Sequence, residues 1–423
     1  MLLLLALVSL VGCGVTLSFV ATPHPSATAT ALTEAQTAPP TSTATPSPVP
    51  PCPAPNPDLP IPHPDAPLLF PQGYIEAIGD YLSGGGTAVE ALLLENEWMP
   101  PRGQATLLAD LTGDGLEERA VAFIDPHSTT FPPLSAMALY RCRAGAMEPF
   151  ATREEEPGFT VGLVGAADLT EDGADELIFF EETCGASTCW NMPHVWHWVD
   201  GAFAELMPPH VEYPSAEITL EGDRLVIVSY GFGSVGAGPQ RTLTETWQWT
   251  GDAMTVTERS QSPPSYLIDL FIDGDAALKA KDYDAAFAAF SRLIHDNDDL
   301  ATASWSYDAA EERAWFVALA HWRLLTLDTL LGNYPAANRE YTWLTAIPAD
   351  DPTYPVGQVA RRFWEAYRQS GNVAYACQEV NADRQLIGPL ITFLNDFGYA
   401  VPSYAPEDIC PFLDPAEGAG GTS

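Results

Sequence analysis

Two short acidic segments hold the residues whose types and spacing could bind a metal ion. The segment Asp110-Leu-Thr-Gly-Asp-Gly-Leu-Glu-Glu118 recurs as Asp168-Leu-Thr-Glu-Asp-Gly-Ala-Asp-Glu176. Oxygen-bearing side chains at positions one, three and five of a tight loop turn inward, and a glycine at six permits the bend. An acid at nine then closes the shell around a hard cation such as Ca²⁺. Because the pattern occurs twice, each time directly before an apolar stretch, we favour calcium over ordinary Asp/Gly turns.

These loops resemble those of the FG-GAP and VCBS repeats of integrin-like β-propellers, which read Asp-x-Asn-x-Asp-Gly-x-x-Asp before a strand. In that family the side chains at positions one, three, five and nine hold calcium. The resemblance implies the metal ligands Asp110, Thr112, Asp114 and Glu118 in the first loop, and Asp168, Thr170, Asp172 and Glu176 in the second. Threonine at position three adds no charge, so we expect weak binding, roughly in the millimolar class, and a structural role for the ion.

Two other motifs are weaker evidence for a binding site. Cys184, Cys189, His194 and His197 are of zinc-binding types, but the two histidines are three residues apart in an expected strand and would point to opposite faces. The segment 231–238 contains a dinucleotide-type glycine pattern, yet a strand is expected to follow it, and a phosphate site needs a helix N-terminus. No catalytic motif is recognised, so we predict no catalytic residues and no enzyme activity. A hydrolase with an unrecognised site is the alternative.

The N-terminal residues indicate export. The first twenty residues are mostly apolar and include Leu10-Val-Gly-Cys13. This run resembles the bacterial lipobox, which implies that Cys13 is lipidated and becomes the mature N-terminus. An uncleaved anchor is the alternative, because roughly 20 apolar residues could span a bilayer. In either case we expect the body of the chain to lie in the cell envelope, on the extracytoplasmic face of the membrane.

The six remaining cysteines fit an oxidising compartment, because an even number in an exported chain indicates disulfides. We predict two pairs, of which the first closes a short loop and the second joins the C-terminal tail to a helix: Cys184 with Cys189, and Cys377 with Cys410. Elimination alone would pair Cys52 with Cys142.

The charge balance excludes some classes of binding partner. The chain has 56 acidic and 18 basic residues, which gives a formal net charge of −38. A surface of this kind repels nucleic acids. It also repels anionic lipid headgroups, so membrane attachment must come from the N-terminal anchor.

Composition changes divide the 423-residue chain into five parts. We expect a signal segment with the lipobox at 1–20 and a Pro/Thr/Ser-rich disordered linker at 21–72. A β-rich module follows at 73–260, then a helical-repeat domain at 265–415 and a flexible tail at 416–423. The β-rich module begins with a short helical segment, and its third unit, at about 216–258, has strands but no acidic loop. The predicted fold class is multidomain α+β, with antiparallel propeller-blade-like repeats before α-helical hairpins.

Residue patterns place the elements that must position the acidic loops. Alternating apolar residues predict strands at 119–125, 137–143, 177–181, 195–199, 225–230, 242–249 and 254–258. Hairpin turns are expected at 200–201, 221–223 and 251–252. Two short helices, broken at 83–86, are expected within 74–95.

The C-terminal domain resembles tetratricopeptide repeats, whose second helix carries a large residue, a small one three later and an aromatic four beyond that. The matching triplets are Tyr283/Ala286/Phe290, Tyr334/Ala337/Tyr341 and, more weakly, Val373/Ala376/Val380. Partner helices are expected at 266–280, 309–330 and 356–369. In the family this arrangement binds peptides or organises assemblies, which implies a protein or peptide partner here.

Together these features predict a lipid-anchored, non-catalytic scaffold for protein–protein interaction, with structural calcium in the β-rich module. The alternative is a calcium-dependent adhesion protein that binds surface glycan or matrix.

Overall fold

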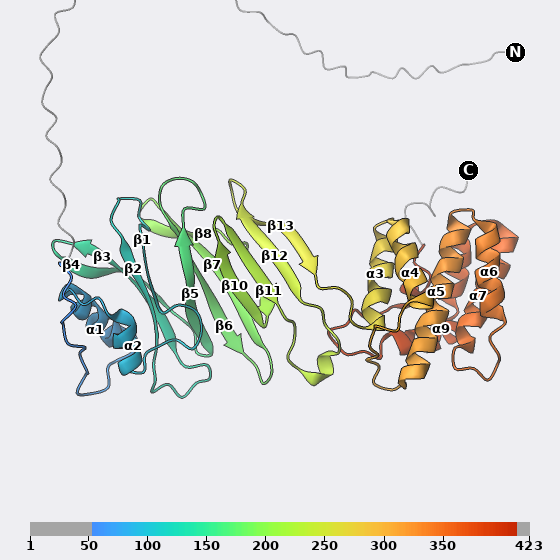
Figure 1. Ribbon diagram of the computed structural model, residues 1–423, viewed down its shortest axis with the longest axis horizontal. Coiled ribbons are helices and arrows are strands. Elements are labelled where there is room, and N and C mark those ends of the chain that lie inside the picture. Colours follow the sequence, from blue (N-terminus) through green and yellow to red (C-terminus); the bar gives the residue numbers. More distant parts are fainter. Residues whose placement is uncertain (1–52, 413–423) are drawn as a thin grey trace, which may run out of the picture. The chain divides into compact units, whose positions relative to one another are not determined.

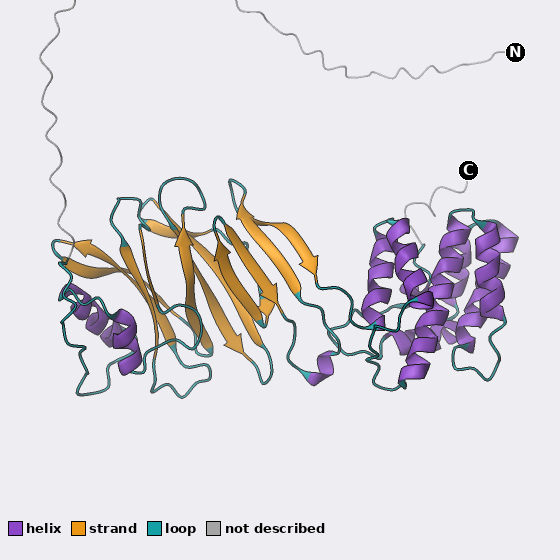
Figure 2. Ribbon diagram, viewed as in Figure 1, coloured by secondary structure: helices purple, strands orange, loops and turns teal. Residues whose placement is uncertain are grey.

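The computed structural model describes residues 53–412 (Figure 1). The expected signal segment with Cys13, the linker up to residue 52, and the residues from 413 onward lie outside the described residues. The described chain is mixed α+β: its strands fall between residues 106 and 261, and most of its helices follow them (Figure 2).

Three antiparallel sheets make up the β-rich module, and the strands of each four-stranded path follow one another in chain order. The first sheet contains β1 (Thr106–Ala109), β2 (Glu118–Ile124), β3 (Ser135–Arg143) and β4 (Ala146–Glu154). The second contains β5 (Phe159–Ala167), β6 (Glu176–Cys184), β7 (Cys189–Val199) and β8 (Ala202–Glu205), with β9 (Tyr213–Pro214) also paired to β7. The third contains β10 (Ala216–Glu221), β11 (Arg224–Ser229), β12 (Leu243–Trp249) and β13 (Met254–Gln261).

The expected hairpin turns are present. Asp200 and Gly201 join β7 to β8 with φ values of 53° and 86°, the positive values that a type I′ turn requires. Gly222 and Gly251, in the other two predicted turns, also have positive φ values.

Apolar side chains pack the sheets against one another. One buried cluster combines Ala122 and Leu139 of the first sheet with Leu163 and Phe179 of the second. Another joins the second sheet to the third and includes Ile178, Val195, Leu225, Ile227 and Trp247. Each sheet therefore buries residues against its neighbour, which fixes the loops that lie at the strand ends.

Two short helices cover the other face of the first sheet. Residues of α1 (Gln72–Ser83) and α2 (Val89–Glu95) form a buried cluster with Phe123 and Tyr140. Leu59, Leu68 and Phe70, from the segment assigned by sequence to the linker, pack against the same cluster, and the N–H of Asn56 donates to the carbonyl of Gly85 (2.7 Å). Residues 53–71 thus pack against the helices α1 and α2, because apolar side chains among the prolines are partly buried against this cluster.

The C-terminal half contains pairs of consecutive helices. These are α3 (Leu267–Lys279) with α4 (Tyr283–His295), α5 (Ala309–Leu330) with α6 (Tyr334–Thr345), and α7 (Tyr354–Ser370) with α8 (Val373–Ala382), followed by α9 (Arg384–Leu394) and the short α10 (Pro406–Ile409). Ala286, Ala337 and Ala376, the small residues of the three triplets, are all 0% exposed. They lie in a single buried cluster that spans the helical domain. No helix within residues 53–412 has the length and hydropathy that a membrane span needs.

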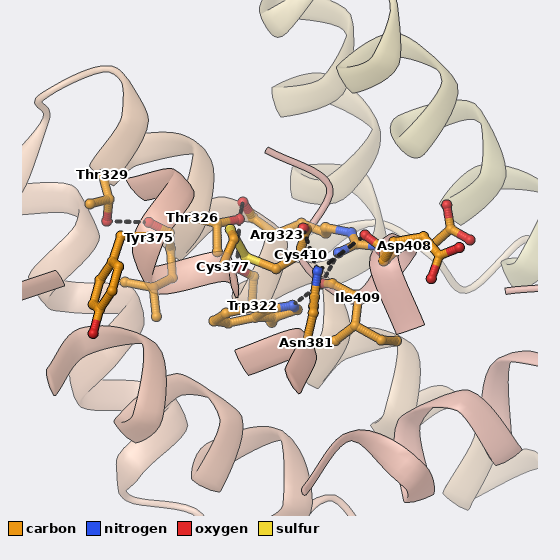
Figure 3. Close-up of a disulfide and its surroundings, with 12 residues drawn as sticks. Trp322, Arg323, Thr326, Thr329, Tyr375, Cys377, Asn381, Asp408, Ile409 and Cys410 are labelled. Atoms are coloured by element: carbon orange, nitrogen blue, oxygen red, sulfur yellow. Dashed lines mark hydrogen bonds between the residues drawn. A yellow bond between two sulfur atoms is a disulfide. The ribbon is translucent and has the colours of Figure 1, made fainter. Parts of the chain in front are cut away.

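The chain end is tied to the helices by the disulfide between Cys377 and Cys410 (Figure 3). Beside it, the Nε1–H of Trp322 donates to the carbonyl of Ile409 (2.8 Å), and the side-chain amide of Asn381 donates to the carbonyl of Cys410 (3.0 Å). The predicted bond between Cys184 and Cys189 is also present, at the closed end of the β6–β7 hairpin. Cys52 lies outside the described residues, so its pairing stays a prediction.

Candidate metal centre in two adjoining acidic loops

The two acidic segments occupy the same place in two successive sheets. Loop 1 (residues 110–118) runs from β1 into β2, and loop 2 (168–176) runs from β5 into β6. The leucine at position two of each loop, Leu111 or Leu169, is buried and anchors the loop to the core. The glycine at position six has a φ value of 82° in loop 1 and 95° in loop 2, which a residue without Cβ adopts most easily. The third sheet has no such loop, because only residues 222 and 223 separate β10 from β11.

The position-one aspartate shapes each loop. Asp110 accepts hydrogen bonds from the backbone N–H groups of Asp114 (3.1 Å) and Gly115 (2.9 Å), and Asp114 accepts one from Leu116 (2.9 Å). Loop 2 repeats the three bonds at 3.0, 3.0 and 2.9 Å. Each carboxylate oxygen has two lone pairs, so these bonds leave acceptor capacity for a cation.

The position-nine glutamate is the buried acid of each loop, with Glu118 2% and Glu176 0% exposed. Glu118 accepts hydrogen bonds from the backbone N–H (3.2 Å) and the hydroxyl (3.1 Å) of Thr112. Burial raises the pKa of Glu118, the bonds from Thr112 oppose that rise, and the charge of Asp114 adds to it. Glu176 accepts from the N–H groups at positions two and three (2.6 and 3.0 Å) and from the position-three hydroxyl (3.2 Å).

The two loops are in contact. The N–H of Asp175 donates to the carbonyl of Asp110 (2.8 Å), and the Asp175 carboxylate accepts from the N–H of Asp110 (3.2 Å). Loop 1 contains four Asp or Glu residues and loop 2 contains five, so nine acidic side chains lie in two adjoining loops. Carboxylates this crowded repel one another, and a divalent cation between them would reduce the repulsion.

A histidine outside the predicted ligand set lies against loop 2. His197, on β7, has Nδ1 at 2.8 Å from Oε1 of Glu176 and Nε2 at 3.6 Å from Oδ2 of Asp172. Donor atoms of these three residues all lie within 4.8 Å of one another. The structure thus adds His197 to the candidate metal residues.

The predicted ligands are only partly brought together. Asp172 and Glu176 of loop 2 belong to the group with His197, and Asp168 does not. Among residues 53–412, the three acids Asp110, Asp114 and Glu118 do not form such a group. Loop 1 therefore has the same hydrogen-bonding pattern as loop 2 without the close clustering of its carboxylates.

The sequence did contain a signal for His197. Cys184 is the cross-strand partner of Cys189, and Leu177 is the partner of Trp196. Continuing the same register by one pair beyond Leu177 and Trp196 places His197 opposite Glu176. A disulfide prediction combined with strand register would have found this pair.

The zinc site considered from sequence is not formed by the cysteines. Glu182, Cys184 and Cys189 lie close together, but the two sulfur atoms are bonded to each other and are not free thiolates. His194 contacts Glu205 (Nδ1 to Oε2, 2.7 Å) and Glu181 (Nε2 to Oε1, 3.2 Å), a separate set of carboxylates from those near His197. The glycine-rich segment 231–238 connects β11 to β12 and has one short turn of 3₁₀ helix, Val235–Ala237, as expected for a hairpin loop.

The donor chemistry of both loops suits calcium. Each loop offers carboxylates at positions one, five and nine and a hydroxyl at position three, and all of these are hard oxygen ligands. The position-nine acid is already oriented by bonds from position three in both loops. No protein-family model matches the chain, and no curated protein sequence is significantly similar to it.

Proposed function

We propose that the protein is a non-catalytic interaction scaffold of the cell envelope, in which calcium in the adjoining loops stabilises the β-rich module. The observation that carries the proposal is the repeated bonding pattern of the two loops, where the same positions donate and accept. Asp110, Thr112, Asp114 and Glu118, with their loop 2 counterparts, would hold the ions. The bound calcium supplies positive charge that offsets carboxylate repulsion, and it takes no part in a reaction.

Fold and location belong to the same proposal. We take the three antiparallel sheets as propeller-blade-like repeats and the helix pairs as tetratricopeptide-like hairpins, on the strength of the motif spacing and the three buried alanines. The disulfides Cys184–Cys189 and Cys377–Cys410 fit an oxidising compartment. Lipidation at Cys13 would attach the protein to the extracytoplasmic face of the membrane.

The calcium part is tested by thermal unfolding of the full chain in EDTA and in Ca²⁺. We expect Ca²⁺ to raise the Tm, and we expect the variant Asp110→Asn with Asp168→Asn to lose that rise. Asp223→Asn is the matched control, because Asp223 lies in the short turn that replaces the acidic loop in the third sheet. Equal Tm values in EDTA and Ca²⁺ would remove calcium from the proposal.

The helical domain has a surface suited to a protein partner. A groove of about 580 Å³ lies between α5 and the connection from α6 to α7, and its lining includes Ala314, Val317, Trp343 and Ile347. Trp343 stacks on His321 with ring centroids 3.8 Å apart, yet the residue stays 41% exposed. Partly exposed aromatic side chains of this kind are frequent anchors of protein interfaces.

Crosslinking the full chain in intact cell envelopes tests the scaffold role. We expect a specific crosslinked protein whose yield falls for Trp343→Ala and is kept for Tyr375→Ala, an exposed aromatic on α8 outside the groove. Equal yields from both variants would show that the groove is not the binding surface. Both variants must keep the circular dichroism spectrum of the parent protein.

A further inference from the structure

His197 makes loop 2 chemically different from loop 1. In loop 2 the imidazole lies between Glu176 and Asp172, and 16% of its side chain is exposed. In the first sheet Arg119 is the partner of Tyr140, so continuing the register by one pair places Arg141 opposite Glu118. Arg141 instead pairs with Glu148 at 3.4 Å. Loop 1 therefore has only oxygen ligands, whereas loop 2 also has a nitrogen ligand.

The hydrogen bond to Glu176 determines which imidazole nitrogen is available. A carboxylate oxygen can only accept, so Nδ1 carries the hydrogen of the 2.8 Å contact with Glu176. In the neutral ring this leaves a lone pair on Nε2. The Nε2 atom lies 3.6 Å from Oδ2 of Asp172, which is a second electron-pair donor. The distance exceeds a hydrogen bond, so the two atoms do not satisfy each other.

The spacing of these two atoms suits a shared transition-metal ion. Zinc–nitrogen and zinc–oxygen bonds of about 2.1 Å at a tetrahedral angle separate two ligand atoms by about 3.4 Å. The observed 3.6 Å is close to this value. Glu176 holds the other ring nitrogen, which is the usual arrangement for a metal-binding histidine and fixes both its tautomer and its orientation.

We propose that His197 Nε2 and Asp172 Oδ2 bind a Zn²⁺ ion, with Glu176 as the positioning residue of the histidine. Imidazole nitrogen favours zinc-class ions, and all-oxygen sets favour calcium. His197 thus lets Zn²⁺ displace Ca²⁺ from loop 2, whereas the all-oxygen loop 1 keeps Ca²⁺. The inference shares loop 2 with the proposed calcium function but does not require calcium to bind in loop 1.

The experiment is calorimetric titration of the metal-free full chain with ZnCl₂ and, separately, with CaCl₂. We expect one Zn²⁺ site whose affinity falls about tenfold or more in Asp172→Asn and in His197→Ala. Asp172 has a 46% exposed side chain, so Asp172→Asn keeps the test informative even if His197→Ala unfolds. His295→Ala, at the exposed end of α4, is the control for incidental zinc binding by a histidine and should keep the parent affinity.

Three outcomes overturn the proposal: no zinc binding, unchanged zinc affinity in Asp172→Asn, or loss of zinc binding in His194→Ala while Asp172→Asn still binds. Asp110→Asn separates this inference from the calcium function. In that variant we expect the heat of calcium binding to loop 1 to disappear and the heat of zinc binding to remain. Absence of calcium binding in the parent chain would contradict the proposed function and leave the zinc site standing.

Discussion

Arg323 of α5 and Asp275 of α3 form a bidentate ion pair inside the helical domain, with Nε–Oδ1 and Nη2–Oδ2 distances of 2.8 Å each. The side chain of Arg323 is 1% exposed and that of Asp275 is 9% exposed. Arg323 also donates to the carbonyls of Asp408 (2.8 Å) and Ile409 (2.5 Å), as Figure 3 shows for the chain end. The guanidinium of Arg323 thus connects α5 to α3 and to α10, the short helix that contains Asp408 and Ile409.

Removing Asp275 should destabilise the protein strongly. Asp275→Asn leaves a buried guanidinium without its counter-charge, which costs about 3–5 kcal/mol in comparable cases. The free energy of unfolding in urea measures the effect. Lys279→Ala is the control, because the Lys279–Asp408 pair is exposed at the lysine (62%) and should contribute about 0–1 kcal/mol. Equal losses in the two variants would contradict the role assigned to the buried pair.

Glu312 predicts a pH dependence of stability. Its Oε2 accepts from the N–H groups of Ala303 (2.8 Å) and Ser304 (2.7 Å), and its Oε1 is buried without a hydrogen-bond partner. Burial raises the pKa of Glu312 above the ordinary value of 4.5, against the lowering effect of the two backbone bonds. As the pH rises from 4.5, the unfolded chain releases its proton first, so this residue lowers the free energy of unfolding up to the folded-state pKa.

Glutamine cannot titrate, so Glu312→Gln should gain stability relative to the parent as the pH rises from about 4 to about 7. Urea unfolding at several pH values measures the difference between the two proteins. Glu311→Gln, at an exposed neighbouring position, should show a much smaller change. A parent–variant difference that stays constant with pH would rule out a raised pKa at Glu312.

Ala286 should not tolerate a large side chain. It is 0% exposed on α4, so Ala286→Leu forces extra methyl groups into a filled core and should cost about 1–3 kcal/mol. Ala288→Leu, on the exposed face of the same helix, is the matched control and should stay near neutral. The midpoint of thermal unfolding distinguishes the two, and similar midpoints would contradict close helix packing at Ala286.

The two disulfides should differ in their contribution to stability. Cys377–Cys410 spans 33 residues and Cys184–Cys189 spans 5, so chain entropy predicts about 1.7 kcal/mol more stabilisation from the longer loop. Paired serine replacements of each bridge, compared by urea unfolding, measure this difference. A larger loss from the shorter bridge would show that native-state contacts, rather than the unfolded chain, dominate.

Sequence patterns predicted the helices more completely than the strands. The expected helix at 309–330 has the same bounds as α5, because a long run rich in the helix formers Ala, Leu and Glu begins after the capping residue Asp308 and ends before Gly332. In contrast, β5 was not predicted individually, since its sequence Phe-Thr-Val-Gly-Leu-Val-Gly-Ala-Ala lacks alternation and contains two glycines. Its burial on both faces comes from neighbouring sheets, which local sequence does not reveal.

The metal-site residues within each loop were predicted from one continuous motif, whereas His197 could be found only with the strand register as well. Asp110 through Glu118 form one continuous motif, so the position of loop 1 before a strand was predicted and is confirmed. His197 is 21 residues beyond Glu176 and reaches loop 2 only through strand pairing. Residue spacing along the chain contains no sign of that contact until the β6–β7 register is known.

The bridge between Cys184 and Cys189 has a consequence for the assembly of loop 2. Side chains alternate along a strand, so a slip of one residue between β6 and β7 would turn His197 away from Glu176. The covalent bond at the hairpin end forbids that slip. The bond therefore holds His197 opposite Glu176 and preserves the geometry that the proposed metal site in loop 2 needs.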